Sequence, residues 1–419
     1  MTARFGQVTA VRSGAVDVRG LGPDVGLGDQ VALGDDDVPG GEVVGLEVGQ
    51  ARVMSFGDPA GLKLGARVRL LPETGVAPAS WWEGRVLDGF GLPLDGRPLA
   101  PGADARPLRS PPPPAVARRA LGARLDTSVA ALDTILPLVR GQRIGIFAGS
   151  GTGKSNLLTT LGNKVKADRL VLALVGERGR EVRDLVERLL GREGGRAVIV
   201  AATSDRSALE RRRAAWTAMA IAETFRDRGE HVLLLVDSLT RTAEAHREVA
   251  VTAGENAVLR GFPPSTQNLL ASLVERAGPG AEGQGDITGV FSVLVQGSDM
   301  EEPLADMARG LLDGHVVLDR EIAERGRFPA IDVRRSVSRA LPDAVTETEL
   351  ALIAEARRIL AAYETAAPLI QAGLYVKGAD TALDRAVDIW PALDAFWSES
   401  FESAAMAFEK LAKVLGGQA

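Results

Sequence analysis

A glycine-rich segment, AGSGTGKS at 148–155, is the part of the sequence whose residue types and spacing point most directly to chemistry. An apolar run at 143–147 precedes it, and a helical pattern with one apolar face follows it. Glycines let a backbone approach an anion closely, and the N–H groups at a helix N-terminus can bind that anion. In such a loop Lys154 would reach the β- and γ-phosphates of ATP or GTP, and the Ser155 hydroxyl group would bind Mg²⁺. A chance match is the alternative, which the flanking strand and helix disfavour, although Ala148 replaces the usual first glycine. The residues expected to bind the nucleotide are Gly149, Ser150, Gly151, Thr152, Gly153, Lys154, Ser155 and Asn156.

Two further apolar runs end in acidic residues. Asp237 closes the run in HVLLLVDSLTR (231–241), where its carboxylate could hold Mg²⁺ through water or could cap the next helix. Beside a phosphate-binding loop the magnesium role is favoured. Glu177, in VGERGRE (175–181), could polarise an attacking water molecule. Its position alone favours the alternative, a surface glutamate paired with Arg178 or Arg180.

Arginines are clustered in two places. In PAIDVRRSVSRAL (329–341), Arg334, Arg335 and Arg339 are either surface charges or include an arginine finger, which would reach a neighbouring subunit's γ-phosphate. Spacing alone does not choose between these roles. The three arginines at 211–213 could suggest nucleic-acid binding, but we expect them to form a solvated helix face.

The elements that must position these residues fall into three regions. Short alternating segments at 7–11, 15–19, 42–48 and 66–71, separated by turn residues, predict a small β-barrel or sandwich. A proline-rich connector, SPPPPA at 110–115, follows. Apolar runs at 143–147, 170–175, 197–201, 232–236, 290–295 and 315–318 alternate with helical patterns, which predicts a parallel sheet covered on both faces. Helical patterns at 347–360 and 401–415 predict an all-α end. We therefore expect an α/β chain with a barrel at 1–75, a nucleotide-binding domain at 76–345 and a helical domain at 346–419.

Composition excludes several classes of protein. The chain has 49 basic and 55 acidic residues, a net charge of −6, which disfavours binding to nucleic acid through a basic surface. It has no cysteine, and the spacing of its three histidines fits no zinc motif. Neither a signal peptide nor an apolar run long enough to cross a bilayer is present. We expect a cytoplasmic protein whose association with a membrane would be peripheral and through partners.

Seven ordered motifs resemble the rotary-type ATPases, and nearly the whole chain takes part in the resemblance. The similarity is greatest to the flagellar and type III secretion export ATPases, relatives of the catalytic subunits of F- and V-type ATP synthases. The motifs are GRVLDGFGLPLDG (84–96), GIFAGSGTGKS (145–155), VGERGRE (175–181), VDSLTR (236–241), RGFPPS (260–265), LLDGHVVL (311–318) and PAIDVRRSVSR (329–339).

The resemblance implies a RecA-like core and specific roles. Lys154 and Ser155 match the phosphate-binding lysine and the magnesium ligand of the family, and Asp237 matches its magnesium-associated aspartate. Glu177 matches the general base, and Arg178 matches the arginine beside that base.

Two further positions follow from the same resemblance. Arg339 matches the arginine finger that acts across a subunit boundary, and Tyr375, in GLYVKGAD (373–380), matches an aromatic residue packed against adenine. Active sites between subunits would make a homohexameric ring the active form.

The resemblance also implies partners. These are a central stalk, a stator-like regulator, chaperones and exported polypeptides, at the inner face of the cytoplasmic membrane. The function expected is Mg²⁺-dependent ATP hydrolysis that energises protein export. The alternatives are a catalytic subunit of an ion-translocating synthase and a nucleotide-binding subunit that does not hydrolyse ATP.

The sequence also departs from the family. It begins at the expected barrel, so we expect it to lack the N-terminal segment through which flagellar relatives bind their regulator. Thr242 and His246 replace the usual Phe and Gln, and the segment 255–278 lacks prolines and an arginine common there, so we expect ring assembly or coupling to the stalk to differ. Trp81 and Trp82 in SWWEG either form a partner contact or lie buried in the barrel wall.

Overall fold

The computed structural model describes residues 5–34, 38–72, 75–191, 195–257, 261–295 and 299–416. The chain divides into two compact units, each of which is described by itself. The first unit consists of Met1–Pro112, Val171–Phe225 and Val236–Arg276. The second unit consists of Pro113–Leu170, Arg226–Leu235 and Ala277–Ala419.

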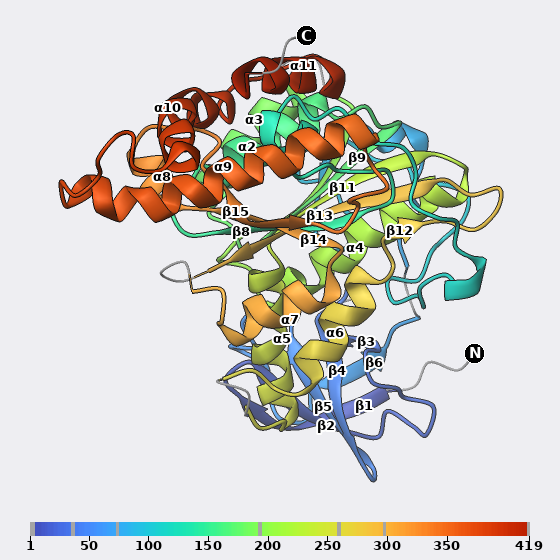
Figure 1. Ribbon diagram of the computed structural model, residues 1–419. Helices are drawn as coiled ribbons and strands as arrows, with labels where there is room; N and C mark the ends of the chain where they lie inside the picture. The colour runs from blue at the N-terminus through green and yellow to red at the C-terminus, as the bar shows by residue number, and fades with distance from the viewer. Residues whose placement is uncertain are drawn as a thin grey trace. The chain divides into compact units, whose positions relative to one another are not determined.

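A closed β-barrel opens the first unit (Figure 1). Its strands are β1 (Phe5–Arg12), β2 (Ala15–Arg19), β3 (Gln30–Leu33), β4 (Gly41–Glu47), β5 (Gln50–Ser55) and β6 (Arg67–Leu70), in the order β1-β2-β5-β4-β3-β6. Alternate side chains point inward, because successive residues of a strand face opposite sides. Val16, Val18, Val31, Val53 and Val68 are fully buried in the barrel core. The predicted barrel is confirmed, whereas β3 and β5 were not among the segments named from the sequence.

Three parallel-sheet strands and four helices complete the first unit. β9 (Arg169–Val175), β10 (Ala197–Ala202) and β7 (Arg85–Leu87) are neighbours in that order, and β10 and β7 run parallel. β10 is buried throughout, as its continuous apolar run predicts for a strand covered on both faces. The helices are α3 (Gly179–Leu190), α4 (Ala208–Asp227), α5 (Leu239–Ala253) and α6 (Ser265–Val274).

Two adjacent tryptophans in the first unit have opposite environments. They lie in a short 3₁₀ helix, Ser80–Trp82, and both indole N–H groups donate to the Ala100 carbonyl group, over 2.9 and 3.0 Å. Trp82 is 3% exposed, but Trp81 is 57% exposed. One residue of the pair is therefore buried and the other presents its ring to solvent.

The arginines at 211–213 do not form a solvated face, so that expectation was wrong. Arg212 and Arg213 are buried on α4, and Arg212 forms an ion pair of 2.7 Å with Glu42 of the barrel. The guanidinium group of Arg213 lies over the ring of Phe90, 4.8 Å from its centroid. Burial is possible because a barrel carboxylate and aromatic rings replace the water that these charges lose.

The strands of the second unit follow the order β15-β14-β8-β13-β11, and the last two residues of β11, Val236 and Asp237, belong to the first unit. Their bounds are β8 (Arg143–Ala148), β11 (His231–Asp237), β13 (Asp286–Leu294), β14 (Gly314–Leu318) and β15 (Ile331–Ser338), and β12 (Gly278–Pro279) pairs with β13. β8 runs parallel to both β13 and β14, whereas β14 and β15 are antiparallel. The sequence predicted all of these but β12 and β15; the latter alternates buried and exposed residues. The short helices are α1 (Ala130–Asp133), α2 (Lys154–Lys164), α7 (Pro303–Leu311) and α8 (Arg320–Glu324).

Three helices form the predicted all-α end of the second unit. They are α9 (Glu347–Gln371), α10 (Thr381–Phe396) and α11 (Ala404–Val414), drawn in orange to red in Figure 1. Thr346 and Glu349 form a capping box at the start of α9, and Tyr363 stacks on Trp390 with ring centroids 4.3 Å apart. α9 runs past the predicted end at 360, and α10 was not named from the sequence.

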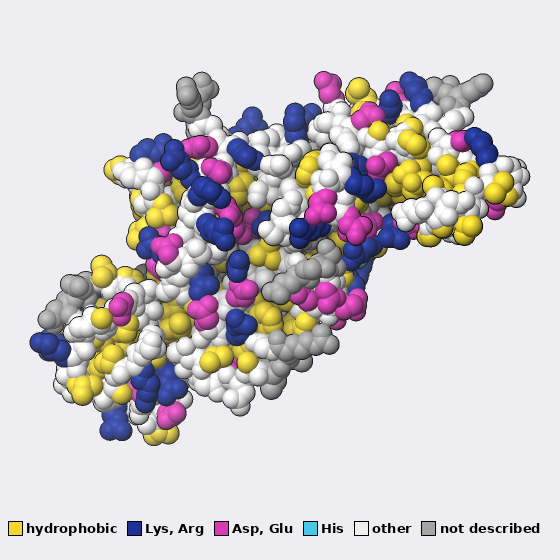
Figure 2. Space-filling view, turned by 90° about the vertical axis from the view of Figure 1, so that its left-hand side faces the viewer, with side chains coloured by type: hydrophobic (Ala, Val, Ile, Leu, Met, Phe, Trp, Pro, Cys, Tyr) yellow, Lys and Arg dark blue, Asp and Glu magenta, His cyan; other side chains and the backbone are white. Residues whose placement is uncertain are grey.

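Two surface properties complete the description. On the face drawn in Figure 2, Lys and Arg side chains are interspersed with Asp and Glu side chains, so neither sign of charge dominates that face. Within the described part of the chain, no helix combines the length and the apolar character that crossing a membrane requires.

Candidate nucleotide-binding site

The glycine-rich segment forms a loop between β8 and α2 in the second unit. Gly151 and Gly153 adopt φ angles of +79° and +86°. Side chains with a Cβ atom rarely occupy this left-handed region, so the loop depends on glycine at both positions. Thr152 is buried and donates from its hydroxyl group to the Gly149 carbonyl group over 3.0 Å. The loop is therefore a fixed turn and not an irregular linker.

The surroundings of the loop fit a phosphate group. A Cβ atom on Gly153 would lie 3.1 Å from the ring of Phe328, so the absence of a side chain keeps this backbone close to its neighbours. Gly153 is also the N-cap residue of α2 and has no side chain with which to cap the helix. The N–H groups and the positive dipole end of a helix bind anions at such a place. The residues present therefore fit the polyphosphate of a nucleotide.

Lys154 and Ser155 lie in the first turn of α2, both half-buried. Leu157, Leu158 and Leu161 are buried and anchor the helix through the apolar face that the sequence indicated. The helix therefore holds the lysine and serine side chains at the end where the phosphate group would lie.

In the first unit, Glu177 and Arg178 follow β9 directly. The Gly176 N–H group donates to the Ala202 carbonyl group over 2.7 Å, and the Ser204 N–H group donates to the Glu177 carbonyl group over 3.0 Å. These bonds fix the backbone from which the half-buried Glu177 side chain projects. Arg178 is exposed, and its ion pair of 4.0 Å is with Glu181.

Asp237 is the last residue of β11 and is 1% exposed. The sequence left open whether it caps the following helix. Ser238 is the N-cap residue of α5, and its hydroxyl group accepts a hydrogen bond from the Arg241 N–H group over 3.1 Å. Capping is therefore the role of Ser238, which removes one of the two alternatives that the sequence left open for Asp237.

Arg241 was not predicted from the sequence as a site residue, and it lies beside Glu177 in the structure. Its aliphatic stem packs on Gly176, with the nearest stem atom 3.1 Å from where a Cβ on that glycine would lie. Its guanidinium group donates to Glu244 over 2.8 Å. That hydrogen bond, with smaller contributions from the charges of Glu177 and Glu181, raises the pKa of Arg241. Its position four residues after Asp237, in the first turn of the next helix, was the available signal.

The remaining predicted site residues lie in the second unit. Arg339 is exposed directly after β15, and its N–H group donates to the Asp313 carbonyl group over 3.0 Å. Tyr375 lies between α9 and α10, where its hydroxyl group donates to Asp384 over 2.5 Å. This bond raises the pKa of Tyr375 to about 12. The predicted residues thus divide between the units: Glu177, Arg178 and Asp237 are in the first, and the others are in the second.

Three protein-family models match the chain. The nucleotide-binding domain of the ATP synthase alpha/beta family matches residues 128–338, and the β-barrel domain of the same family matches residues 8–71. The C-terminal domain of the type III secretion ATPase EscN matches residues 345–413. The chain belongs to the ATP synthase alpha/beta family.

Individual relatives place the chain among the flagellar and secretion members of that family. It is 45% identical over 410 residues to the flagellum-specific ATP synthase of Caulobacter vibrioides, covering 96% of this chain and 92% of that protein. It is 45% identical to the SPI-2 type 3 secretion system ATPase of Salmonella typhimurium, covering 89% and 87%. The assembled ATPase EscN of enteropathogenic E. coli superposes with a TM-score of 0.89 at 36% identity, covering 98% of this chain and all of that one. The predicted family, fold class and ATPase character are confirmed.

Proposed function

We propose that this chain hydrolyses ATP with Mg²⁺ in a homohexameric ring and that this hydrolysis energises protein export by a flagellar or type III secretion apparatus. The observation that carries the proposal is the combination of the glycine-dependent phosphate loop with a full-length match to an assembled secretion ATPase. A second solved structure, with a TM-score of 0.87, contains EscN with its central stalk EscO, which supports a stalk partner here as well.

By their match to the family's motifs, the loop backbone and Lys154 would bind the triphosphate, and Ser155 and Asp237 would hold the magnesium ion. When bound, that ion neutralises charge on the phosphate oxygens. Glu177 accepts a proton from the attacking water molecule, and Arg178 lies beside it.

Arg339 and Tyr375 complete the proposed site. The exposed Arg339 at the end of β15 stabilises charge on the phosphates bound by a neighbouring subunit. Tyr375 packs against adenine. Because Arg339 serves the adjacent site, a single chain is expected to bind nucleotide and to hydrolyse it poorly.

The C-terminal domain separates this function from that of a synthase subunit. Residues 345–413 match the secretion-ATPase C-terminal model, whereas 8–71 and 128–338 match models of the wider family. We also propose that the chain lies in the cytoplasm, peripheral to the membrane through its stalk and regulator partners, and that it acts with chaperones on exported polypeptides. The domain division at 75/76 and 345/346 is part of the same proposal.

The rate of ATP hydrolysis against protein concentration tests the ring. We expect the specific activity to rise with concentration as rings assemble, because each site needs a neighbour's arginine. A specific activity that is high and independent of concentration, from a species that remains monomeric in light scattering, would contradict the proposal.

Paired variants test the general base. Glu177→Gln is expected to bind ATP normally and to lower the turnover number by about 10²- to 10⁴-fold, the range typical of general-base catalysis. Glu181→Gln is the matched control, since Glu181 lies four residues further on, is 41% exposed at its side chain and pairs only at 4.0 Å with Arg178. Equal turnover by the two variants would remove Glu177 from the mechanism.

Mixing experiments test the arginine finger. Arg339→Ala is expected to bind nucleotide and to lose hydrolysis, whereas Arg334→Ala, which removes an exposed arginine of β15, is expected to keep it. Rings that mix Arg339→Ala with Lys154→Ala should regain part of the activity, because some sites then combine an intact loop with an intact arginine. No recovery in mixed rings of verified composition would show that Arg339 does not act across the boundary.

A further inference from the structure

A cavity of about 510 Å³ lies in the first unit, and none of its lining residues belongs to the predicted nucleotide site. Its size is within the range of small-molecule sites. Its walls come from α4, α5, α6 with the residue Arg276 that follows it, and residues 109–111 at the start of the proline-rich connector. The lining residues are Arg109, Ser110, Pro111, Arg212, Trp216, His246, Asn268, Leu269, Ser272 and Arg276.

Two arginines of this cavity share a single carboxylate. The guanidinium groups of Arg109 and Arg212 donate to the same oxygen of Glu42, over 3.1 and 2.7 Å. Glu42 is 4% exposed, so water screens this group of charges weakly. One negative charge between two positive charges leaves an excess of positive charge at the wall of the cavity.

Arg212 also has a donor without a partner. Its Nε atom makes no hydrogen bond within the protein. Because the residue is only 5% exposed, water does not readily take the place of the missing partner. An unsatisfied buried donor costs about 1–3 kcal/mol, and a charged one costs more. The rest of the group is engaged, because one terminal nitrogen contacts Glu42 and the other lies 3.4 Å from His246 Nδ1. Burial, opposed by Glu42 and reinforced by Arg109, lowers the pKa of Arg212 to about 10.

Histidine 246 adds a polar wall that is neutral at pH 7. Burial, with the charge of Arg212, lowers the pKa of His246 to about 4. A neutral ring can accept from Arg212 at Nδ1 and donate from Nε2 to the Ser265 hydroxyl group, which lies 2.8 Å away. Ser265 in turn donates to Glu255 over 2.6 Å. This chain of hydrogen bonds fixes the ring beside the excess positive charge.

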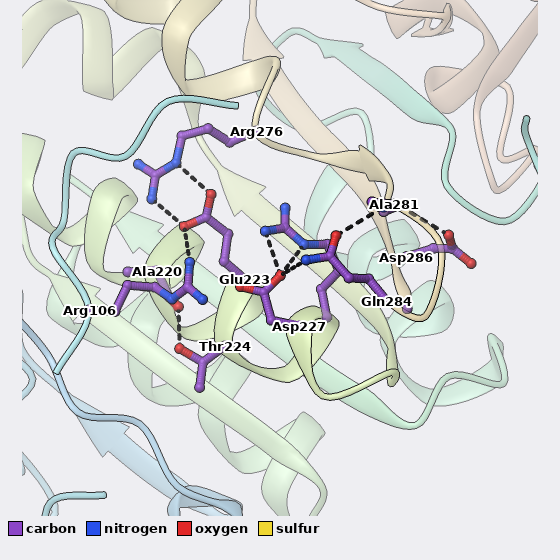
Figure 3. Close-up of polar contacts among 12 residues, drawn as sticks. Arg106, Ala220, Glu223, Thr224, Asp227, Arg276, Ala281, Gln284 and Asp286 are labelled. Atoms are coloured by element: carbon purple, nitrogen blue, oxygen red, sulfur yellow. Dashed lines mark hydrogen bonds and ion pairs between the residues drawn. The ribbon is translucent and has the colours of Figure 1, made fainter. Parts of the chain in front are cut away.

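The other walls hold the arginines in place. The guanidinium groups of Arg109 and Arg212 lie 4.3 and 4.9 Å from the centroid of the Trp216 ring. Arg276 forms two hydrogen bonds with Glu223, over 2.9 and 2.7 Å, as Figure 3 shows. Groups that are fixed before a ligand arrives lose little entropy when it binds.

We propose that this cavity is a binding site for a small ligand that carries a phosphate or carboxylate group, whose oxygens accept hydrogen bonds from Arg109 and Arg212. Glu42 carries one negative charge between two arginines, and the ligand supplies a second negative charge. The ligand also offers an acceptor near the buried Nε atom of Arg212. Asn268 and Ser272 are exposed on α6 at the rim and provide neutral hydrogen-bonding groups for the remainder of the ligand.

The test uses the full chain carrying Lys154→Ala, so that the phosphate loop contributes little to anion binding. Pyrophosphate and citrate, both without Mg²⁺, are the two probes, and calorimetric titration is the readout. Arg109→Gln should weaken binding by about 10- to 100-fold, the worth of one hydrogen bond to a charged group. The variant should fold, since the Arg109 side chain is 51% exposed and its loss leaves Glu42 and Arg212 as a one-to-one pair.

Two further variants separate the cavity from general effects of charge. Arg211→Gln removes the neighbouring positive charge on α4, which pairs with Glu248 and does not line the cavity, and it should leave binding unchanged. Asn268→Asp places a carboxylate at the rim, so it should abolish binding and raise the melting temperature of the ligand-free protein.

Each outcome is decisive. Binding of pyrophosphate alone assigns a phosphate ligand, binding of citrate alone assigns a carboxylate ligand, and binding of both assigns a general oxyanion site. Failure of both probes to bind, or binding that Arg109→Gln and Asn268→Asp leave unchanged, overturns the proposal. Loss of ATP hydrolysis plays no part in this readout, so the result is independent of the proposed export function.

Discussion

Replacing Gly151 by alanine isolates the part of nucleotide binding that depends on the backbone of the phosphate loop. Gly151 has a φ of +79°, and a Cβ atom there would meet no atom within 4 Å. The substitution therefore adds no clash and acts only through the backbone angle. Gly153 has a similar φ of +86° but a different neighbour. A Cβ atom built on Gly153 would lie 3.1 Å from the ring of Phe328, whereas a Cβ atom on Gly151 would have no neighbour.

The size of the effect follows from the backbone angle. A non-glycine residue in the left-handed region costs about 1–2 kcal/mol. Ser150 and Gly151 are exposed, so we expect the alanine variant without nucleotide to shift position 151 out of the left-handed region, with little change in stability. Binding of the triphosphate requires the original loop, so the strain returns as lost affinity, about 5- to 30-fold. Gly153→Ala should lose a similar amount, because Phe328 is 46% exposed and its ring can move away.

Titration with a fluorescent ATP analogue, together with a urea unfolding curve for each variant, measures both quantities. Gly14→Ala is the matched control: Gly14 has a φ of +75°, also with no atom within 4 Å of its Cβ position, and it lies in the β1–β2 turn of the barrel. We expect this control to bind the nucleotide as the original chain does. An unchanged affinity for Gly151→Ala would show that bound phosphates do not need the left-handed turn.

Two further predictions concern buried charge. Glu223→Gln breaks an ion pair with Arg276 in which both side chains are at most 2% exposed. We expect the free energy of unfolding, measured with urea, to fall by about 3–5 kcal/mol. A fall of less than about 1 kcal/mol, the level of an exposed pair such as Arg320–Glu324, would contradict this. Burial lowers the pKa values of His231 and His246 to about 4, whereas the pKa of an unfolded histidine is about 6.5. Between about pH 4 and pH 6.5 the unfolded chain therefore binds more protons than the folded chain. The free energy of unfolding falls as the pH drops through this window. At pH 5 the loss is about 2 kcal/mol for each histidine, and His231→Gln should remove one such contribution from the pH dependence of the unfolding midpoint.

The sequence predicted best the features that depend on neighbours in the chain. The phosphate loop, the run that becomes β8 and the apolar face of α2 are contiguous, so residue type and spacing carry the whole signal. The barrel was predicted from alternation, since one face of each strand meets the core and the other meets solvent. β15 was missed, although it alternates, because it is interrupted by charged residues such as Arg334 and Arg335.

The sequence predicted least well which charged side chains are buried and with which residues they pair. A run of three arginines on a helix predicts a solvated face. In the structure Arg212 is buried and pairs with Glu42, which lies 170 residues away in the chain. No local pattern reports a carboxylate at that distance. The cavity beside Arg212 was invisible for the same reason, since its walls come from segments that meet only in the folded unit.

The sequence analysis gave His246 as a departure from the glutamine that the resemblance implies, and the structure shows what the histidine itself contacts. A glutamine amide offers one acceptor and one donor group, and a neutral imidazole offers the same pair at Nδ1 and Nε2. Because burial keeps His246 neutral at pH 7, its ring can accept from Arg212 and donate to Ser265. The imidazole at this position can therefore make the two kinds of hydrogen bond that an amide could make, and it forms a rigid part of the wall beside Arg212. The departure that the sequence led us to associate with ring assembly or the stalk thus bears first on the cavity between α4, α5 and α6.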